Sequence, residues 1–476
     1  MKNSKIVKLL GTLSEDEVGD FIKFIESNFF NTNQKVANFG KYLLQFHPNI
    51  NEANISKAQI IKVLSKSTKG DHKLLSYWAS DLVKLLEKFV IYQYQNTQAQ
   101  TGQIALMERY AEANLDVYYK QAKQKFDEFQ LNQAEHNEMY YFNLMKAAEI
   151  DNMLFLKKRK RDNNESLQQA INNLDWFYLA LKLKYACETA NRQMVLSGSY
   201  SLKLINDIIK FIENYEGKLP AQILIYYNIY NSLIKPTEEG YFNELKLLLA
   251  ENSKLFAVKD SRNMYLYAIN YCVSKINSGS TDYVDELLTI YKQSLQQNIL
   301  LEDEMISPWS YQNIVGAAIR ANEFDWAKEF IYKYKKHLHP KFKNNAFHYN
   351  LASYHFSVSN LSKAQDYLLK VDYNDTNYVI GTRVLLMKIY FENKEYEALE
   401  SLLNAFRNYL HRNSKMSARM RKLYLNTIKY VKKLNNVHVR DFKKLHHIKK
   451  QIETTDNLAD RKWMLSKIDS YLKFEV

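Results

Sequence analysis

The chain of 476 residues is long enough to bury a large core, and its formal net charge is +14. It contains only 5 prolines and 11 glycines, a scarcity that favours helices joined by short loops. No run of about 18 apolar residues occurs, which excludes a membrane-spanning helix. Cys187 and Cys272 lie in apolar helical patterns and predict buried free thiols in a reducing compartment. Because the apolar run 6–10 is too short for a signal-peptide core, we expect a cytoplasmic protein.

Residues 1–100 are predicted to form an N-terminal helical head. Ser14 and Glu17 stand at the spacing of a capping box, and an apolar helical stripe follows over residues 18–25. A long helix over residues 72–94 carries a wide apolar stripe, which implies that it is buried.

The next two segments are predicted to be helical as well. Residues 101–165 have the pattern of two long polar helices that end in the basic run 157–161. This run is more typical of a solvated helix end than of a phosphate or acidic-partner contact. Residues 166–300 predict degenerate helix pairs. The paired ranges are 167–196 with 200–215, 221–235 with 237–256, and 262–277 with 281–298.

Residues 301–411 are predicted to contain three helix pairs at near-constant spacing. Thirty-seven residues separate Tyr311 from His348, and 35 separate His348 from Arg383. Behind each of these positions, mostly apolar residues return at offsets that place them on one stripe of a helix. Such a pair cannot cover its own apolar face, so it must stack on its neighbours. The repeated positions are Ile314, Val315, Ala318, Phe324, Ala327 and Ile331, then Leu351, Ala352, Leu361, Ala364 and Leu368, then Leu386, Met387, Tyr396, Leu399 and Leu403.

This spacing and residue order resemble the tetratricopeptide repeat, a helix–turn–helix of about 34 residues. The consensus tryptophan of the first helix is replaced by Tyr311, His348 and Arg383. The resemblance implies an all-α chain, in which an α-solenoid of such repeats lies between the helical head and a C-terminal helical cap. Generic helical-hairpin repeats would produce the same pattern.

The resemblance also implies a binding groove, because the first helices of such repeats line the concave face. A partner peptide or helix would be held there by aromatic and polar contacts. The alternative is that some of these side chains pack between repeats. The candidate groove residues are Trp309, Gln312, Arg320, Tyr349, Phe356, Lys388 and Phe391.

A second resemblance covers most of the chain. The run Leu-Ser-Glu-Asp-Glu at 13–17, the turn Asn-Phe-Phe-Asn at 28–31 and His47-Pro48 are similar to the start of a large, uncharacterised family of long helical bacterial proteins. That family usually has a proline where this chain has Asn28. The similarity continues at 270–272 and at 461–465, and it implies no known activity.

Residues 412–476 are predicted to form a basic C-terminal helical cap, which ends in an amphipathic helix around Trp463. The overlapping segment 401–450 holds 14 Lys and Arg against one acid, Asp441, so it carries +13 and the rest of the chain +1. This block is either an electrostatic footprint for an anionic partner or a solvated face balanced by acidic residues elsewhere in the fold. The candidate patch residues are Arg419, Arg421, Lys422, Lys432, Lys433, Lys443, Lys444, Lys449 and Lys450.

The chain shows no catalytic signature. Phosphate-loop, dinucleotide-binding, nucleophile-elbow and zinc-protease patterns are absent, and two distant cysteines cannot form a Cys-rich zinc site. We therefore expect no catalytic, cofactor or metal site. The sequence predicts a non-enzymatic protein–protein interaction scaffold. The alternatives are a nucleic-acid-binding helical protein that uses the 401–450 segment and a structural subunit of a larger assembly.

Overall fold

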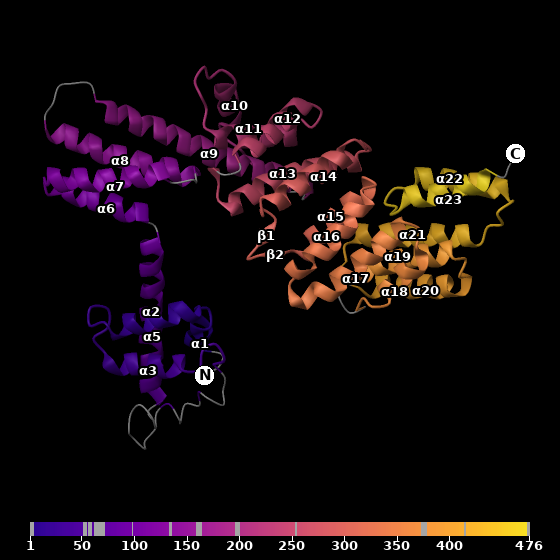
Figure 1. The fold of residues 1–476 in the computed structure, drawn as a ribbon, viewed down its shortest axis with the longest axis horizontal. Coiled ribbons are helices and arrows are strands. Elements are labelled where there is room, and N and C mark those ends of the chain that lie inside the picture. The colour runs from indigo at the N-terminus through magenta and orange to yellow at the C-terminus, as the bar shows by residue number, and fades with distance from the viewer. Residues whose placement is uncertain are drawn as a thin grey trace. The chain divides into compact units, whose positions relative to one another are not determined.

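The computed structural model describes residues 4–50, 55, 60, 72–97, 99–132, 136–158, 164–195, 200–252, 255–372, 378–413 and 416–473. Almost all regular structure in these residues is α-helical (Figure 1), which confirms the all-α class. The chain forms two compact units, Met1–Lys182 and Leu183–Val476, a coarser division than the five predicted segments. None of the described helices is both long and apolar enough to cross a membrane.

Four helices form the core at the start of the first unit in the described residues. Ser14 and Glu17 form the predicted capping box: each side-chain oxygen accepts the other residue's backbone N–H, at 2.7 and 3.3 Å. Ile25 and Leu82 are fully buried in this core. Gly40 allows its own helix to pack closely against both of these side chains. A Cβ atom at Gly40 would lie 2.8 Å from Ile25 Cδ1 and 2.9 Å from Leu82 Cδ1. The four helices are α1 (Lys5–Leu10), α2 (Glu15–Glu26), α3 (Gln34–Leu44) and α5 (His72–Thr97).

Three helices, rather than the predicted two, follow in the described residues of the first unit. They are α6 (Ala99–Glu112), α7 (Asp116–Asn132) and α8 (Glu138–Lys157), and α9 (Glu165–Val195) contains the boundary between the units. The break between α6 and α7 depends on Asn114, whose φ of 57° is left-handed. The N–H of Leu115 then donates to the carbonyl of Tyr110 at 2.9 Å. Sequence analysis missed this break because neither glycine nor proline marks it.

Two residues of the basic run 157–161 make internal contacts. Lys157 Nζ donates to the carbonyl of Ala111 at 2.9 Å, and Lys158 forms a 2.8 Å ion pair with Asp116. The other three residues of the run lie outside the described part of the chain. The two described lysines therefore stabilise the α6–α8 packing.

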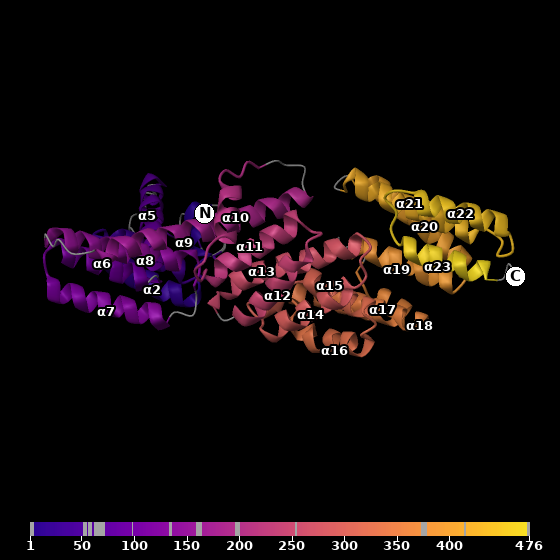
Figure 2. The ribbon, with the colours of Figure 1, turned by 90° about the horizontal axis from the view of Figure 1, so that it is seen from above.

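The second unit is a succession of helix pairs. Each helix from α11 to α21 packs on the next, and α15 also contacts α17, which contacts α19. The pairs from α13 to α20 follow one another along this unit in both views of the ribbon (Figures 1 and 2). The elements are α10 (Ile205–Glu213), α11 (Ala221–Ile234), α12 (Glu239–Asn252), α13 (Val258–Asn277), α14 (Tyr283–Gln296), α15 (Pro308–Arg320), α16 (Phe324–Tyr334), the 3-10 helix Lys335–His337, α17 (Pro340–Ser357), α18 (Leu361–Leu368), α19 (Val379–Glu392), α20 (Tyr396–Arg412), α21 (Ala418–Asn435), α22 (Phe442–Thr454) and α23 (Arg461–Leu472).

The three predicted repeats share one turn geometry. Asn322, Ser359 and Lys394 each have a left-handed φ, of 58°, 60° and 60°. In each turn the N–H of the following residue donates to the carbonyl five residues earlier, at 2.9, 2.8 and 2.9 Å. These bonds define a Schellman motif, which ends the first helix and satisfies its last carbonyls.

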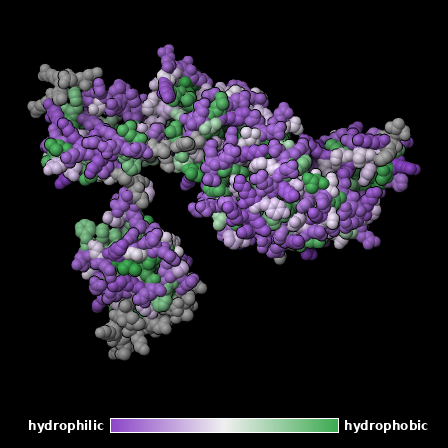
Figure 3. Space-filling view, in the orientation of Figure 1, coloured by the Kyte–Doolittle hydropathy of each residue, from purple (hydrophilic) through white to green (hydrophobic). Residues whose placement is uncertain are grey.

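Burial follows the predicted stripe closely. The second-helix positions Ala327, Ala364 and Leu399 are fully buried at the centre of each pair. The first residue of each second helix departs from the pattern, since Phe324 and Leu361 are half-buried and Tyr396 is 56% exposed. On the face drawn in Figure 3, hydrophobic residues form small separate groups within a largely hydrophilic surface.

A short β-hairpin between α14 and α15 was not predicted. Strands β1 (Leu301–Glu302) and β2 (Met305–Ile306) pair antiparallel. Asp303 and Glu304 turn the chain with φ of 47° and 61°. Positive φ at both central residues is typical of a type I′ turn, which Asn-Gly favours far more than Asp-Glu. The sequence signal for this hairpin is therefore weak.

Candidate partner-binding surfaces

Three of the predicted groove residues line one hollow. Gln312 and Arg320 of α15 and Tyr349 of α17 surround a cavity of about 420 Å³, together with residues of α13 and α14. Asn277 and Asn313 add further amide groups to its wall. Arg320 lies in the last turn of α15 and is exposed. The hollow is therefore lined by apolar side chains and neutral hydrogen-bonding groups, with one cation at its edge.

The position of Tyr349 depends on a glycine in the next repeat. A Cβ atom at Gly381 of α19 would lie 2.5 Å from the Tyr349 Oη atom. Burial and the nearby Asp460 carboxylate raise the pKa of Tyr349 to about 12. The phenol therefore stays protonated at neutral pH.

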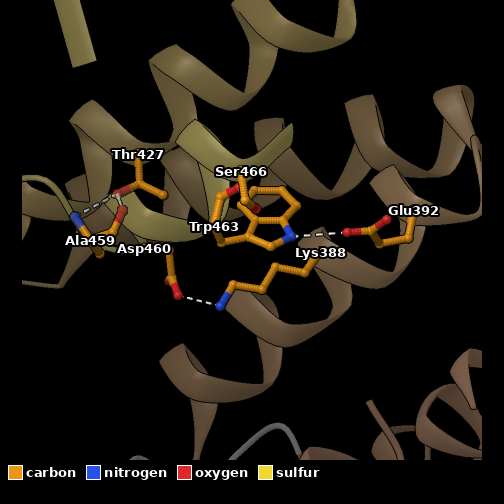
Figure 4. A network of polar contacts seen from close by, with 7 residues as sticks. All are labelled: Lys388, Glu392, Thr427, Ala459, Asp460, Trp463 and Ser466. Carbon is orange, nitrogen blue, oxygen red and sulfur yellow. Dashed lines mark hydrogen bonds and ion pairs between the residues drawn. The ribbon is translucent and has the colours of Figure 1, made fainter. Parts of the chain in front are cut away.

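The other end of the predicted groove is covered by the chain itself. The indole of Trp463, in α23, packs edge-on against Phe391 of α19, with ring centroids 5.3 Å apart. The Lys388 ammonium lies 5.8 Å from the centre of the indole and 6.0 Å from that of Phe356. It also forms an ion pair with Asp460, just before α23, as Figure 4 shows.

These contacts correct the expectation that Lys388 and Phe391 are open to a partner. Phe391 is only 7% exposed, and the side chain of Lys388 is 15% exposed. Phe356 is half-buried against the core formed by α17, α18 and α19. Trp309 is 57% exposed in the first turn of α15, and it does not line the hollow.

A second set of polar contacts attaches α23 to α19. The indole N–H of Trp463 donates to the Glu392 carboxylate at 3.0 Å (Figure 4). Lys467 forms a 2.6 Å ion pair with the same carboxylate. The two residues that contact the Glu392 carboxylate, Trp463 and Lys467, are largely shielded from water. Their bonds to it are therefore stronger than ordinary surface pairs.

The loop that precedes α23 is held by a buried threonine. Thr427 of α21 is fully buried, and its Oγ1 accepts the N–H of Ala459 at 3.2 Å. Asp460 follows with a left-handed φ of 53°, which directs its carboxylate to Lys388. Figure 4 shows these two anchor points side by side.

The basic segment forms a second hollow, of about 770 Å³, between α20, α21 and α22. Lys432, Lys433 and Lys444 of the predicted patch line it. Arg407 and Lys429 line it as well, although the predicted patch omitted them. For Lys429 the spacing was a usable signal, because Lys429, Lys432 and Lys433 stand at positions i, i+3 and i+4 of one helix.

The other patch residues do not line this hollow. Arg421 donates to the carbonyl of Asn413 at 2.9 Å and so supports the turn before α21. Lys449 forms a 2.8 Å ion pair with Asp469 of α23. The remaining four are exposed at other places on α21 and α22. They are Arg419, Lys422, Lys443 and Lys450.

Acidic residues balance part of the basic charge. Lys432 pairs with Glu400 of α20 at 2.9 Å, and Lys444 pairs with Asp441 at 2.7 Å. Within the described residues, Arg407 and Lys429 form no ion pair. The segment is therefore neither fully neutralised nor an unbroken cationic face.

No family model matches the chain, and no match is found among the curated proteins or the solved structures. Both family resemblances therefore stay predictions. Among the described residues, no three His, Cys, Asp or Glu side chains are placed to hold a metal ion.

Proposed function

We propose that the chain is a cytoplasmic, non-enzymatic interaction scaffold whose helix pairs stack as a tetratricopeptide-like α-solenoid. The hollow lined by α13, α14, α15 and α17 binds a segment of a partner protein. One observation carries this proposal: Gln312, Arg320 and Tyr349, from two successive first helices, meet in a single open hollow. The two buried free thiols, Cys187 and Cys272, suit a reducing compartment.

The chemistry of the hollow favours a peptide. Amide groups both donate and accept hydrogen bonds, so Asn277, Gln312 and Asn313 match the alternating groups of a peptide backbone. Arg320 would pair with a carboxylate on the bound segment. A volume of about 420 Å³ is at the small end of ligand pockets, so it fits a few side chains of that segment.

The test is affinity capture from native cell lysate with the full chain as bait, repeated with nuclease and at high salt. A protein partner that survives both treatments is expected. Arg320→Glu with Gln312→Ala should lower its recovery about 10-fold, because a few lost contacts at a binding centre cost that much. Lys328→Glu, on the exposed face of α16, is the matched charge-reversal control and should retain the partner. Equal recovery by both variants would contradict the proposal.

The nucleic-acid alternative predicts the opposite pattern in the same assay. Capture of nucleic acid would fall steeply with salt, because phosphate contacts release counterions. Charge reversal at Lys443 and Lys444, or at Lys449 and Lys450, would reduce it, whereas Arg320→Glu with Gln312→Ala would not. The structural-subunit alternative predicts instead a partner that co-purifies at fixed stoichiometry.

A further inference from the structure

The basic hollow between α20, α21 and α22 combines charge with an apolar floor. Leu425 and Ile428 of α21 and Ile448 of α22 form much of that floor. Arg407 and Lys429 stand at the wall, both exposed and, in the described part of the chain, without an ion-pair partner. Lys432, Lys433 and Lys444 continue the cationic wall. The hollow therefore offers apolar contact and positive charge at the same place.

We propose that this hollow binds an acidic amphipathic helix of a partner protein. The apolar stripe of such a helix would lie on the floor, and carboxylates on its flanks would pair with Arg407 and Lys429. Buried apolar area supplies most of the affinity in helix-in-groove recognition, and complementary charge sets the partner and its orientation. This surface is distinct from the α13–α17 hollow, so each proposal stands or fails alone.

The composition of the hollow disfavours nucleic acid as its occupant. Single-stranded nucleic acid is usually held by aromatic side chains on which its bases stack. Among the described residues that line the hollow there is no Phe, Tyr or Trp, and His411 supplies its one ring. An apolar floor gives nothing to a phosphate backbone, which needs water or cations around it.

Fluorescence anisotropy with the full chain and three labelled probes tests the proposal. The first probe is a synthetic helix of about 18 residues, five turns, with leucine along one stripe and glutamate on both flanks. The second has the same composition, but its leucines are scattered around the helix. The third is a single-stranded oligonucleotide. We expect the amphipathic helix to bind with a Kd of roughly 10 μM and the scattered one about 10-fold more weakly, since the floor discriminates between them.

Two matched double variants locate the site. Arg407→Glu with Lys429→Glu should weaken the amphipathic helix about 10-fold or more, because carboxylates would then face carboxylates. Lys443→Glu with Lys450→Glu makes the same change in net charge on exposed residues outside the hollow, and should change the Kd less than about 2-fold. Circular dichroism of both variants verifies that they fold.

The floor has its own variant. Val437 lines the hollow as well. Leu425→Ala with Val437→Ala removes half-buried apolar area and should weaken the amphipathic helix about 5-fold, with the basic wall intact. The proposal is overturned if the two peptides bind equally, if the two charge reversals have equal effects, or if no probe binds. It is also overturned if the oligonucleotide binds most tightly and loses affinity only with Arg407→Glu and Lys429→Glu. In that case nucleic acid occupies the hollow.

Discussion

Lys388 illustrates how a neighbouring segment changes the role of a single residue. Its position on α19 is that of a groove residue, yet its ammonium contacts Trp463 and Asp460, which lie more than 70 residues later in the chain. A cation between an indole face and a carboxylate is satisfied on both sides. Lys388 is thus part of the attachment of α23, and a partner could reach it only after α23 moves.

Replacement of Trp463 should expose this surface. Trp463→Ala is expected to lower the free energy of unfolding by about 2 kcal/mol, less than for a fully buried tryptophan because the indole is half-buried. Urea unfolding measures this loss. Amine-reactive labelling read by mass spectrometry should also show faster modification of Lys388, with Lys394 on an exposed turn as the unchanged control. Unaltered labelling of Lys388 would mean that Trp463 does not shield it.

The turn between paired helices is the recurring element of this fold. Three of these turns place a residue other than glycine in a left-handed conformation, which costs about 1 kcal/mol through the clash of Cβ with the backbone. The fold tolerates this cost because the left-handed conformation permits the Schellman hydrogen bonds. These bonds end the first helix and allow the second to begin. The spacing of the repeats thus depends on these turns as much as on the apolar stripe.

Glycine at one of these turns should stabilise the protein. Lys394→Gly removes the Cβ clash and is expected to raise the free energy of unfolding by about 0.5 kcal/mol, after allowance for the greater freedom of glycine in the unfolded chain. Lys328→Gly, at an exposed interior position of α16, should lower it by about 1 kcal/mol. Thermal unfolding followed by circular dichroism compares the two. A loss of stability in both variants would contradict the argument.

The whole molecule is rich in tyrosine, with 36 residues distributed along the chain. Many lie in the core, and burial raises the pKa of Tyr141, Tyr291 and Tyr349 to about 12. Below pH 10 these phenols are protonated in both the folded and the unfolded chain. Between pH 10 and 12 the folded chain holds protons that the unfolded chain has lost, so stability falls as pH rises.

Alkaline unfolding tests this linkage. The urea midpoint should change little from tyrosine ionisation below about pH 10 and then fall towards pH 12. The ultraviolet absorbance of phenolate should rise in two steps, for exposed tyrosines first and for buried ones together with loss of helix. Tyr349→Phe should reduce the pH dependence, because phenylalanine has no phenol to titrate. A single step that leaves the helical signal intact would contradict the burial argument.

The sequence by itself determined the all-α class and, in the repeated segment, the helices and the residues that face the core. The apolar stripe behind Tyr311 follows from the local geometry of the helix, and this geometry stays the same whatever packs against it. The same reasoning missed the turn at Asn114 and the hairpin at Asp303-Glu304, where residues other than glycine adopt positive φ. At such positions the backbone cost is offset by packing and hydrogen bonds that a local pattern does not contain.

Only the tertiary structure decided which candidate surfaces are open. Periodicity shows which side of a helix is polar, but it does not show what lies against that side. Trp463 covers Phe391 because α23 folds back onto a helix far earlier in the chain. Arg407 and Lys429 meet in one hollow for a similar reason, since α20 and α21 pack together. Contacts between distant segments depend on the shapes of both faces, which is why a single helical pattern could not predict them.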